Sequence, residues 1–205
     1  MAILYFFGPD GSGKSTLTQS LAKVMEKRGY KVKLSWMRGS HTITSLIAKI
    51  LSRFDLFKGS ENPYYAIKIP KKFRTFWQII EFVGALPVIF AGFLIPSFLG
   101  YCVMADRYVL DLAVWIYLTT EDYNFFKKFE AKLLLALTQK TKAKFYITAD
   151  IKELSARKPN FWFPKEQLIV YGKLAKSINA QIIDTTDKSV DESLQEVLNV
   201  IDQKQ

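Results

Sequence analysis

Short apolar runs alternate along this chain with longer stretches in which apolar residues recur every three or four positions. The first run, Ala2–Phe7, is typical of a buried strand, and Leu17, Leu21 and Met25 then share one face of a helix. Further strands are expected at residues 31–36, 101–105, 144–148 and 181–183. Strands that alternate with helices predict an α/β fold with a five-stranded parallel sheet, doubly wound by helices.

The same periodicity predicts the helices between these strands. They are expected around residues 43–51, 110–118, 125–137, 166–178 and 190–201. Ser189 and Glu192 have the spacing of a capping box at the start of the last helix. Glycine, serine and proline residues predict a loop over 54–65. The basic segment 152–165, which contains two prolines, is expected to form a short lid on a single domain spanning 1–205.

Composition narrows the class of protein. With 205 residues, 49% of them hydrophobic, the chain can bury the core of one α/β domain and is too apolar to be disordered. Its net charge of +10 suits nucleic acid, an anionic membrane or polyphosphate substrates. Because the basic residues form no long run, we expect small-molecule substrates and no nucleic acid. The single cysteine, Cys102, excludes a disulfide framework, and the first strand has no charged leader before it, so a cytoplasmic protein is expected.

The segment Gly8–Thr16 fits the pattern G-x-x-x-x-G-K-[ST] without a mismatch, and it lies where the first strand gives way to the first helix. Glycines let backbone N–H groups close around a phosphate chain, and the helix N-terminus adds positive potential. A chance glycine-rich turn would not require this strand–loop–helix context. The chain is therefore expected to bind a nucleoside triphosphate through this P-loop, by the residues Gly8, Asp10, Gly11, Ser12, Gly13, Lys14, Ser15 and Thr16.

A second signal follows the strand at 101–105, where Asp106, Arg107 and Tyr108 stand in sequence. A carboxylate at the carboxyl end of a parallel strand beside a phosphate loop can hold Mg²⁺, directly or through water. The neighbouring arginine can grip a second phosphorylated substrate with its planar guanidinium. By itself the pair would fit an ordinary surface ion pair, but together with the phosphate loop it predicts a shared magnesium–polyphosphate site.

The stretch from Phe82 to Ala105 carries no charged side chain and is long enough to span a membrane. Pro87 and Pro96 are expected to divide it into short helices. A span would also place the phosphate loop and Asp106 on opposite sides of the bilayer. We therefore expect buried helices or a homodimer face, with membrane contact as the less favoured alternative.

Taken together, these motifs resemble those of the thymidylate kinase family, which has an acidic residue within the phosphate loop, as Asp10 is here, and an Asp-Arg-Tyr motif like Asp106–Tyr108. Arg38 after the second strand and Asp184 after the last one add weaker support. The resemblance spans nearly the whole chain. It implies a P-loop kinase fold and ATP- and Mg²⁺-dependent phosphorylation of a deoxynucleoside monophosphate, usually dTMP.

The resemblance also implies roles for single residues. Lys14 and Ser15 would hold the ATP phosphates and Mg²⁺, and Asp106 would organise the metal. Asp10 would meet the acceptor sugar, while Arg38 and Arg107 would clamp the acceptor phosphate. Arg157 would be the catalytic arginine of the lid, although the basic residues around it also fit a solvated surface. The loop after Asp184 would border the adenine.

Two departures from the family pattern bear on the acceptor. The family usually follows the arginine with a Glu-Pro-Gly-Gly-like run, whereas Gly39, Ser40 and His41 follow Arg38 here. At the offsets where the family has a serine and then Ala-Tyr-Gln, this chain has Asp111 and the run 114–116, Val-Trp-Ile, so no amide reads a base edge there.

Two other functions therefore remain open at this stage. One is a P-loop kinase with a non-nucleotide acceptor, and the other is a non-catalytic ATP-binding protein docked to a membrane or partner through residues 79–100.

Overall fold

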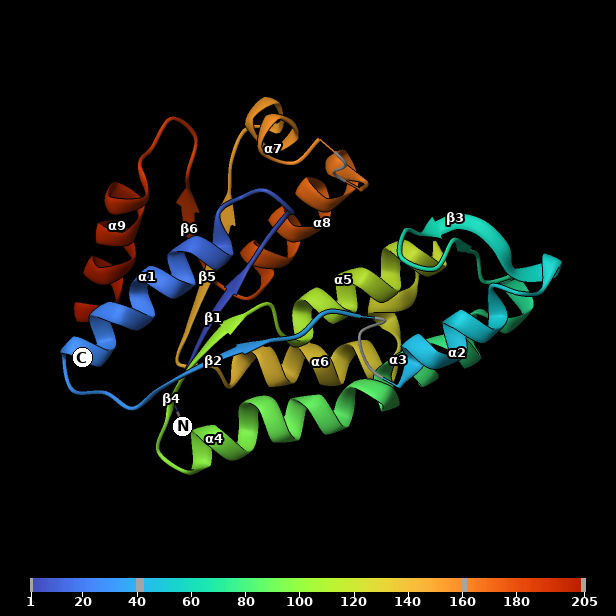
Figure 1. Cartoon of the computed structure of the whole chain (residues 1–205), viewed down its shortest axis with the longest axis horizontal. Coiled ribbons are helices and arrows are strands. Elements are labelled where there is room, and N and C mark those ends of the chain that lie inside the picture. Colours follow the sequence, from blue (N-terminus) through green and yellow to red (C-terminus); the bar gives the residue numbers. More distant parts are fainter. Residues whose placement is uncertain (1, 40–42, 160–161, 204–205) are drawn as a thin grey trace.

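A computed structural model describes residues 2–39, 43–159 and 162–203 of the chain (Figure 1). Strand β1 (Ala2–Phe7) runs through the middle of the sheet, and its side chains alternate between two cores. Ile3, Tyr5 and Phe7 belong to one buried cluster, while Leu4 and Phe6 belong to another on the opposite face. This alternation explains why the first apolar run is continuous, since a strand covered on both faces has no polar side.

The described residues contain one five-stranded sheet in the order β2-β4-β1-β5-β6, and its neighbouring strands are all parallel. The other four strands are β2 (Val32–Trp36), β4 (Cys102–Asp106), β5 (Ala143–Thr148) and β6 (Gln181–Asp184). Phe6 of β1 and Trp36 of β2 both lie opposite Asp106 of β4, so these strands end side by side. The predicted five-stranded, doubly wound fold is confirmed, and its central carboxyl edge is where such sheets bind ligands.

Helices cover both faces of the sheet (Figure 1). On the face of Leu4 and Phe6 lie α1 (Lys14–Lys27) and α9 (Val190–Asp202). On the other face lie α3 (Arg74–Ile89), α5 (Val109–Thr120), α6 (Phe129–Gln139) and α8 (Pro164–Ser177). Two shorter helices are α2 (Thr44–Leu51) and α7 (Ile151–Arg157). Ser189 and Glu192 form the predicted capping box at the start of α9.

The expectation that Pro87 and Pro96 break the apolar segment into short helices is wrong. Helix α3 continues through Pro87 into a π-helical turn (Phe90–Leu94) and then α4 (Ile95–Phe98), which makes one helix from Lys71 to Phe98. The wider turn starts three residues after Pro87, and the N–H of Phe90 finds the carbonyls of Leu86 and Pro87. The carbonyl that Pro96 would crowd in a regular helix is that of Gly92, four residues earlier, and it lies inside this wider turn.

This long helix has a buried and an exposed apolar side. Ala85, Ile89 and Phe93 pack in the core, whereas an exposed stripe of large apolar side chains faces away from it. The stripe consists of Phe76, Ile79, Val83, Phe90, Ile95 and Phe98. Its steps are three, four or seven residues long except for the step of five from Phe90 to Ile95, which coincides with the π-helical turn. Because a π turn contains more residues than an α turn, the stripe stays on one face.

By length and composition alone, this helix is the one among the described residues that could cross a membrane.

The loop expected over 54–65 contains more structure than predicted. A 3₁₀ turn (Asp55–Phe57) leads into β3 (Lys58–Asn62), whose two ends each form an antiparallel bridge with Ile67. The Asn62 side chain closes the turn by accepting hydrogen bonds from the N–H groups of Tyr64 and Tyr65, at 3.0 and 3.3 Å. An Asx turn can be predicted from neighbouring residues. The residues around Ile67, which pair with β3, have no alternating pattern that would predict a strand.

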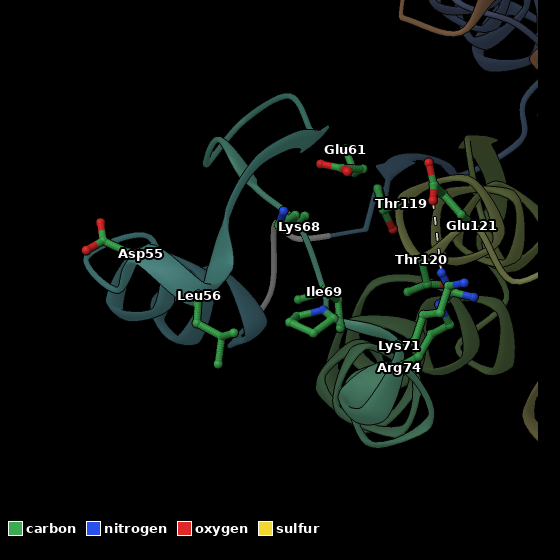
Figure 2. Close-up of a pocket in the computed structure, with 11 residues that line it drawn as sticks. Asp55, Leu56, Glu61, Lys68, Ile69, Lys71, Arg74, Thr119, Thr120 and Glu121 are labelled. Atoms are coloured by element: carbon green, nitrogen blue, oxygen red, sulfur yellow. Dashed lines mark ion pairs between the residues drawn. The ribbon is translucent and has the colours of Figure 1, made fainter.

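A cavity of about 440 Å³ lies between β3, the start of α3 and the end of α5 (Figure 2). Its polar wall carries both signs of charge, from Glu61, Lys68, Arg74 and Glu121 among others. Thr119 and Thr120 close it at the last turn of α5. It therefore lies at the end of α5 remote from the phosphate loop.

Candidate functional site

The phosphate loop connects β1 to α1 and depends on its glycines. Gly8 has φ +141°, and a Cβ built there would lie 2.1 Å from the carbonyl oxygen of Ile147 in β5. Only glycine allows this close approach of the two strand ends. At the other end of the loop Gly13 caps α1 in the left-handed conformation. The N-terminus of a 14-residue helix thus opens onto the loop, as anion binding requires.

The buried side chain of Lys14 lies along its own loop. Its Nζ donates hydrogen bonds to the carbonyl of Pro9 and to Ser12 Oγ, the second at 3.1 Å. Burial, and then repulsion from Arg107, lower the pKa of Lys14 to about 7, although Asp10 opposes this effect. A lysine in such surroundings is stabilised in its charged form by an added anion, so the site favours a phosphate chain.

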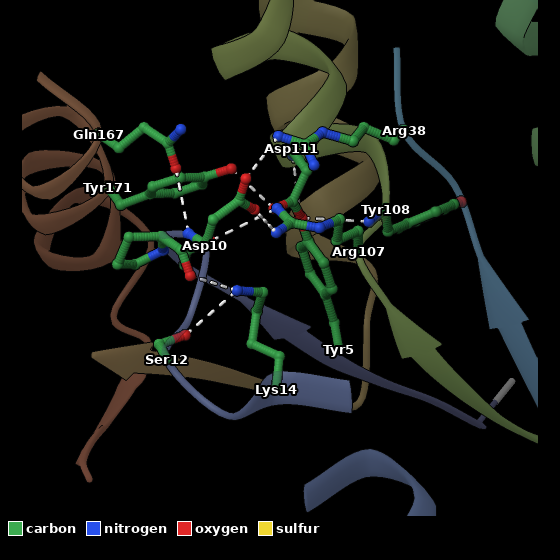
Figure 3. Close-up of polar contacts among 12 residues, drawn as sticks. Tyr5, Asp10, Ser12, Lys14, Arg38, Arg107, Tyr108, Asp111, Gln167 and Tyr171 are labelled. Carbon is green, nitrogen blue, oxygen red and sulfur yellow. Dashed lines mark hydrogen bonds and ion pairs between the residues drawn. The ribbon is translucent and has the colours of Figure 1, made fainter. Parts of the chain in front are cut away.

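Asp10 joins the phosphate loop to three cations from elsewhere in the fold, of which Figure 3 shows Arg38 and Arg107. Its Oδ2 accepts from Arg38 at 2.9 Å and from Lys158 at 3.2 Å, and its Oδ1 accepts from Arg107. Burial alone would raise the pKa of Asp10, but Arg107, Arg38 and the lysines hold it well below its usual value. Asp10 is therefore a permanent carboxylate that gathers cations from the ends of β2, β4 and α7.

Arg107 occupies a strained position directly after β4. Its φ is +68°, a conformation rare for residues other than glycine, and its N–H donates to Phe6 O at 3.0 Å. One terminal nitrogen of the guanidinium donates to Asp111 at 3.1 Å and the other to Asp10. Burial opposes the charge of Arg107, but these two carboxylates raise its pKa further. Such strain at a charged, buried residue is typical of functional sites.

Ser15 and Asp106, the two residues expected to bind the metal, line the same cavity of about 150 Å³ between the start of α1 and the ends of β2 and β4. Asp106 Oδ1 is buried and has no hydrogen-bond partner among the described residues. A hydroxyl and an unused carboxylate oxygen are hard donors of the kind Mg²⁺ prefers, and this metal keeps several of its waters. The residues present therefore fit a magnesium ion held beside the phosphate loop.

Arg157 faces a different cavity, of about 260 Å³, which Gly13, Thr16 and Lys188 also line. Its guanidinium donates to Thr185 Oγ1 at 2.9 Å and to Thr185 O at 3.0 Å, and it pairs with Glu153. This cavity borders the loop after β6, where the resemblance placed an adenine. Within the basic segment 152–165, it is the next residue, Lys158, that contacts Asp10.

On the side away from α1, aromatic rings surround Arg38. Its guanidinium lies 5.4 Å from the ring centroid of Tyr64 and 5.5 Å from that of Trp115. The two rings stack on each other at 5.3 Å, and Trp162 contacts Trp115 at 5.1 Å. Trp115 also lies so close to the backbone of Gly39 that a Cβ there would fall 1.8 Å from its ring. Arg38 thus packs against both rings while its terminal nitrogen donates to Asp10.

The structure brings together the predicted residues Asp10, Lys14, Arg38 and Arg107, but the sequence reading missed several of their partners. These are Asp111, Lys158 and Gln167, together with Tyr5 and Tyr171, which donate to Asp111. Gln167 and Tyr171 are four residues apart and share one face of α8, a spacing that a search for polar pairs on helices could have found. His41 lies outside the described residues.

The chain is similar to known proteins in its structure and not in its sequence. No family model and no curated protein sequence matches the chain. Among solved structures, thymidylate kinase from Ehrlichia chaffeensis matches with a TM-score of 0.59 and 17% identity, covering 98% of both chains. The thymidylate kinase of Candida albicans matches with a TM-score of 0.64 and 16% identity, covering 98% of this chain and 91% of that one. The chain has the thymidylate kinase fold.

Within this thymidylate kinase fold, sequence similarity is low while coverage is nearly complete. The match therefore spans the strands of the sheet and the helices on both of its faces. This agreement confirms the fold that the sequence resemblance implied.

Proposed function

We propose that this protein is a kinase that transfers the γ-phosphoryl group of ATP to a nucleoside monophosphate, with dTMP as the first candidate. The proposal rests mainly on the Asp10 cluster, which consists of Asp10 and the three cations that pair with it, Arg38, Arg107 and Lys158. This cluster joins a phosphate loop to two arginines, Arg38 and Arg107, from the ends of neighbouring strands. A protein that only bound ATP would have less need of a second set of buried cations beside the loop.

In the proposed reaction, a phosphate oxygen of the acceptor attacks the γ-phosphorus of ATP, and the bond from that phosphorus to the bridging oxygen of ADP breaks. The transition state spreads negative charge over the γ-phosphate oxygens, so catalysis consists mainly of positioning and of nearby positive charge. Lys14 and the N-terminus of α1 supply that charge on the ATP side, and Arg38 and Arg107 supply it on the acceptor side. Mg²⁺ held by Ser15 and Asp106 would neutralise phosphate charge when bound.

The test is an acceptor panel. Purified protein is incubated with ATP, Mg²⁺ and each common nucleoside or deoxynucleoside monophosphate, and diphosphate formation is followed by ³¹P NMR. We expect dTDP as a product, and no transfer with Lys14→Ala. ATP binding without any diphosphate product would reject the proposal.

A non-nucleotide acceptor is the second candidate, because aromatic rings fill the region around Arg38. Trp115 stands where the family has a tyrosine, and Tyr64 and Trp162 pack against it, so a base would have to displace rings or lie beyond them. The same assay with sugars and other small hydroxyl compounds separates the two candidates. Transfer to such a compound, with none to a monophosphate, would favour the second.

For the oligomeric state we propose a homodimer. The exposed apolar stripe of α3 and α4 includes Phe76 and Phe98, which are 66% and 76% exposed. Contiguous apolar surface of this kind on a folded domain is typical of an interaction face, and a two-fold axis would pair the stripe with itself. Partition of the protein into a membrane fraction, with ATP binding but no transfer, would instead favour the non-catalytic, membrane-docked alternative.

A further inference from the structure

The carboxylate of Asp111 is buried in the first turn of α5 and uses all of its hydrogen-bonding capacity. It accepts from the hydroxyls of Tyr5 at 2.6 Å and Tyr171 at 2.8 Å. It also accepts from Arg107 at 3.1 Å and from the N–H of Tyr108 at 3.2 Å. A carboxylate has about four lone-pair sites, so none is left for a substrate. Asp111 therefore acts on the site through its partners.

These partners come from three separate parts of the fold (Figure 3). Tyr5 belongs to β1, Tyr171 to α8, and Arg107 follows β4. Burial, and then the charge of Asp111, raise the pKa of Tyr5 and of Tyr171 well above the usual value for tyrosine. Both tyrosines are therefore neutral at ordinary pH, and both hydroxyl protons stay available to Asp111.

The residue that this network holds is Arg107, whose left-handed backbone is costly and whose side chain is almost fully buried. Asp10 holds one terminal nitrogen of the guanidinium and Asp111 holds the other. Asp10 also binds Arg38 and Lys158, so its hold on Arg107 is shared among three cations. An incoming phosphate would compete with Asp10 for the same cations, whereas Asp111 lies deeper and binds no other cation among the described residues.

We propose that Asp111, itself fixed by Tyr5 and Tyr171, is a positioning residue that keeps Arg107 in place for the acceptor phosphate. The role toward the acceptor phosphate rests on the proposed kinase function. The immobility of the Arg107 guanidinium can be measured whether or not the protein is a kinase. Its physical basis is preorganisation, because a guanidinium held before the acceptor arrives needs no reorientation on binding.

The first experiment compares Asp111→Asn, which keeps the shape and removes the charge, with wild-type enzyme in steady-state kinetics. We expect the KM for dTMP to rise about tenfold, the cost of losing one charge-assisted hydrogen bond. The KM for ATP should change less than about twofold, because Arg107 faces the acceptor side. Tyr146→Phe is the matched control, since Tyr146 stacks on Tyr171 with centroids 6.5 Å apart and makes no contact with Asp111. A KM for dTMP that is unchanged in a folded Asp111→Asn would overturn the proposal.

The second experiment does not depend on transfer. Arginine side-chain NMR measures rotation about the Cζ–N bonds of the guanidinium, with Arg107→Lys used to assign the signal. We expect slow rotation for Arg107 in the wild type and clearly faster rotation in Asp111→Asn, while equal rates would refute the positioning role. A wild type that phosphorylates no monophosphate but shows this difference rejects only the proposed function. If Asp111→Asn does not fold, Tyr171→Phe, which removes one of the four hydrogen bonds, is measured in its place.

Discussion

Two neighbouring basic residues at the end of α7 face different parts of the site. Lys158 Nζ lies 3.2 Å from Asp10, and its stem packs beside Gly11 of the phosphate loop. Arg157 is bound by Thr185 and borders the cavity next to Thr16. The family resemblance assigned the catalytic lid role to Arg157, and this assignment stays a prediction that the pair now makes easy to test.

We expect Lys158→Met to lower kcat, by about 100-fold if its charge stabilises the transferred phosphoryl group. Arg157→Met should chiefly raise the KM for ATP, because its cavity adjoins the start of α1 rather than the acceptor clamp. Steady-state kinetics of both variants decides the point. The opposite pattern would return the catalytic role to Arg157.

Lys14 should make ATP binding depend on protons. With a pKa of about 7 in the free site, Lys14 is largely neutral at pH 8.5, and a bound triphosphate raises that pKa again. Binding at pH 8.5 should therefore take up close to one proton, and binding at pH 6 almost none, since Lys14 is already charged there. Calorimetry in buffers of different ionisation enthalpy measures the uptake. Equal proton uptake at the two pH values would show that Lys14 does not titrate in this range.

Among the elements, the long helix made of α3, the π turn and α4 has the clearest consequence. Val83 lies in the middle of its exposed stripe and is 52% exposed. In the proposed homodimer, Val83→Glu would bury a charge against apolar side chains, so we expect a monomer that still folds. Light scattering after size-exclusion chromatography measures the mass. Ile169→Glu on α8, where the side chain is 57% exposed outside the stripe, is the control. A Val83→Glu protein that stays dimeric would place the interface elsewhere.

The capping box of α9 offers a test of stability at the level of a single helix end. Ser189 Oγ accepts from the N–H of Glu192 at 3.2 Å, and the Glu192 carboxylate accepts from the N–H of Ser189 at 2.8 Å. Ser189→Ala should lower the free energy of unfolding by about 1 kcal/mol. Urea denaturation measures the loss, and Ser60→Ala, at an exposed position in β3, serves as the control. An unchanged midpoint would mean that the box adds nothing to the fold.

For the molecule as a whole, the ion pairs of Asp10 should make the stability of the fold in acid depend on the candidate site. The folded pKa of Asp10 is depressed, so its stabilising contribution is complete above the unfolded pKa of 3.8 and is lost as pH falls further. Asp10→Asn removes this contribution, which we expect to be about 2 kcal/mol, and the variant should lose less stability between pH 5 and pH 2. Parallel pH titrations of the melting temperature compare the two proteins. Equal slopes would show that other carboxylates control acid unfolding.

The sequence predicted those parts of the molecule whose signal is local. The phosphate loop and the motif at Asp106 are contiguous, and each strand of the sheet carries its own apolar or alternating pattern, so the sheet and its carboxyl edge could be anticipated. The partners of Asp111 could not, because Tyr5 and Tyr171 lie 106 and 60 residues away from it. A buried hydroxyl also looks the same in a sequence as an exposed one. The prolines misled for a related reason, since the π turn just before Pro96 leaves no mark in the pattern.

The contact between Gly39 and Trp115 limits how this protein can change over time. A single methyl group at residue 39 has no space while the indole is in place, because the two would be 1.8 Å apart. A smaller ring or an aliphatic residue at 115 would have to be acquired first, and only then could position 39 vary. Any history that led from another residue at 39 to the present pair must have passed through glycine before tryptophan.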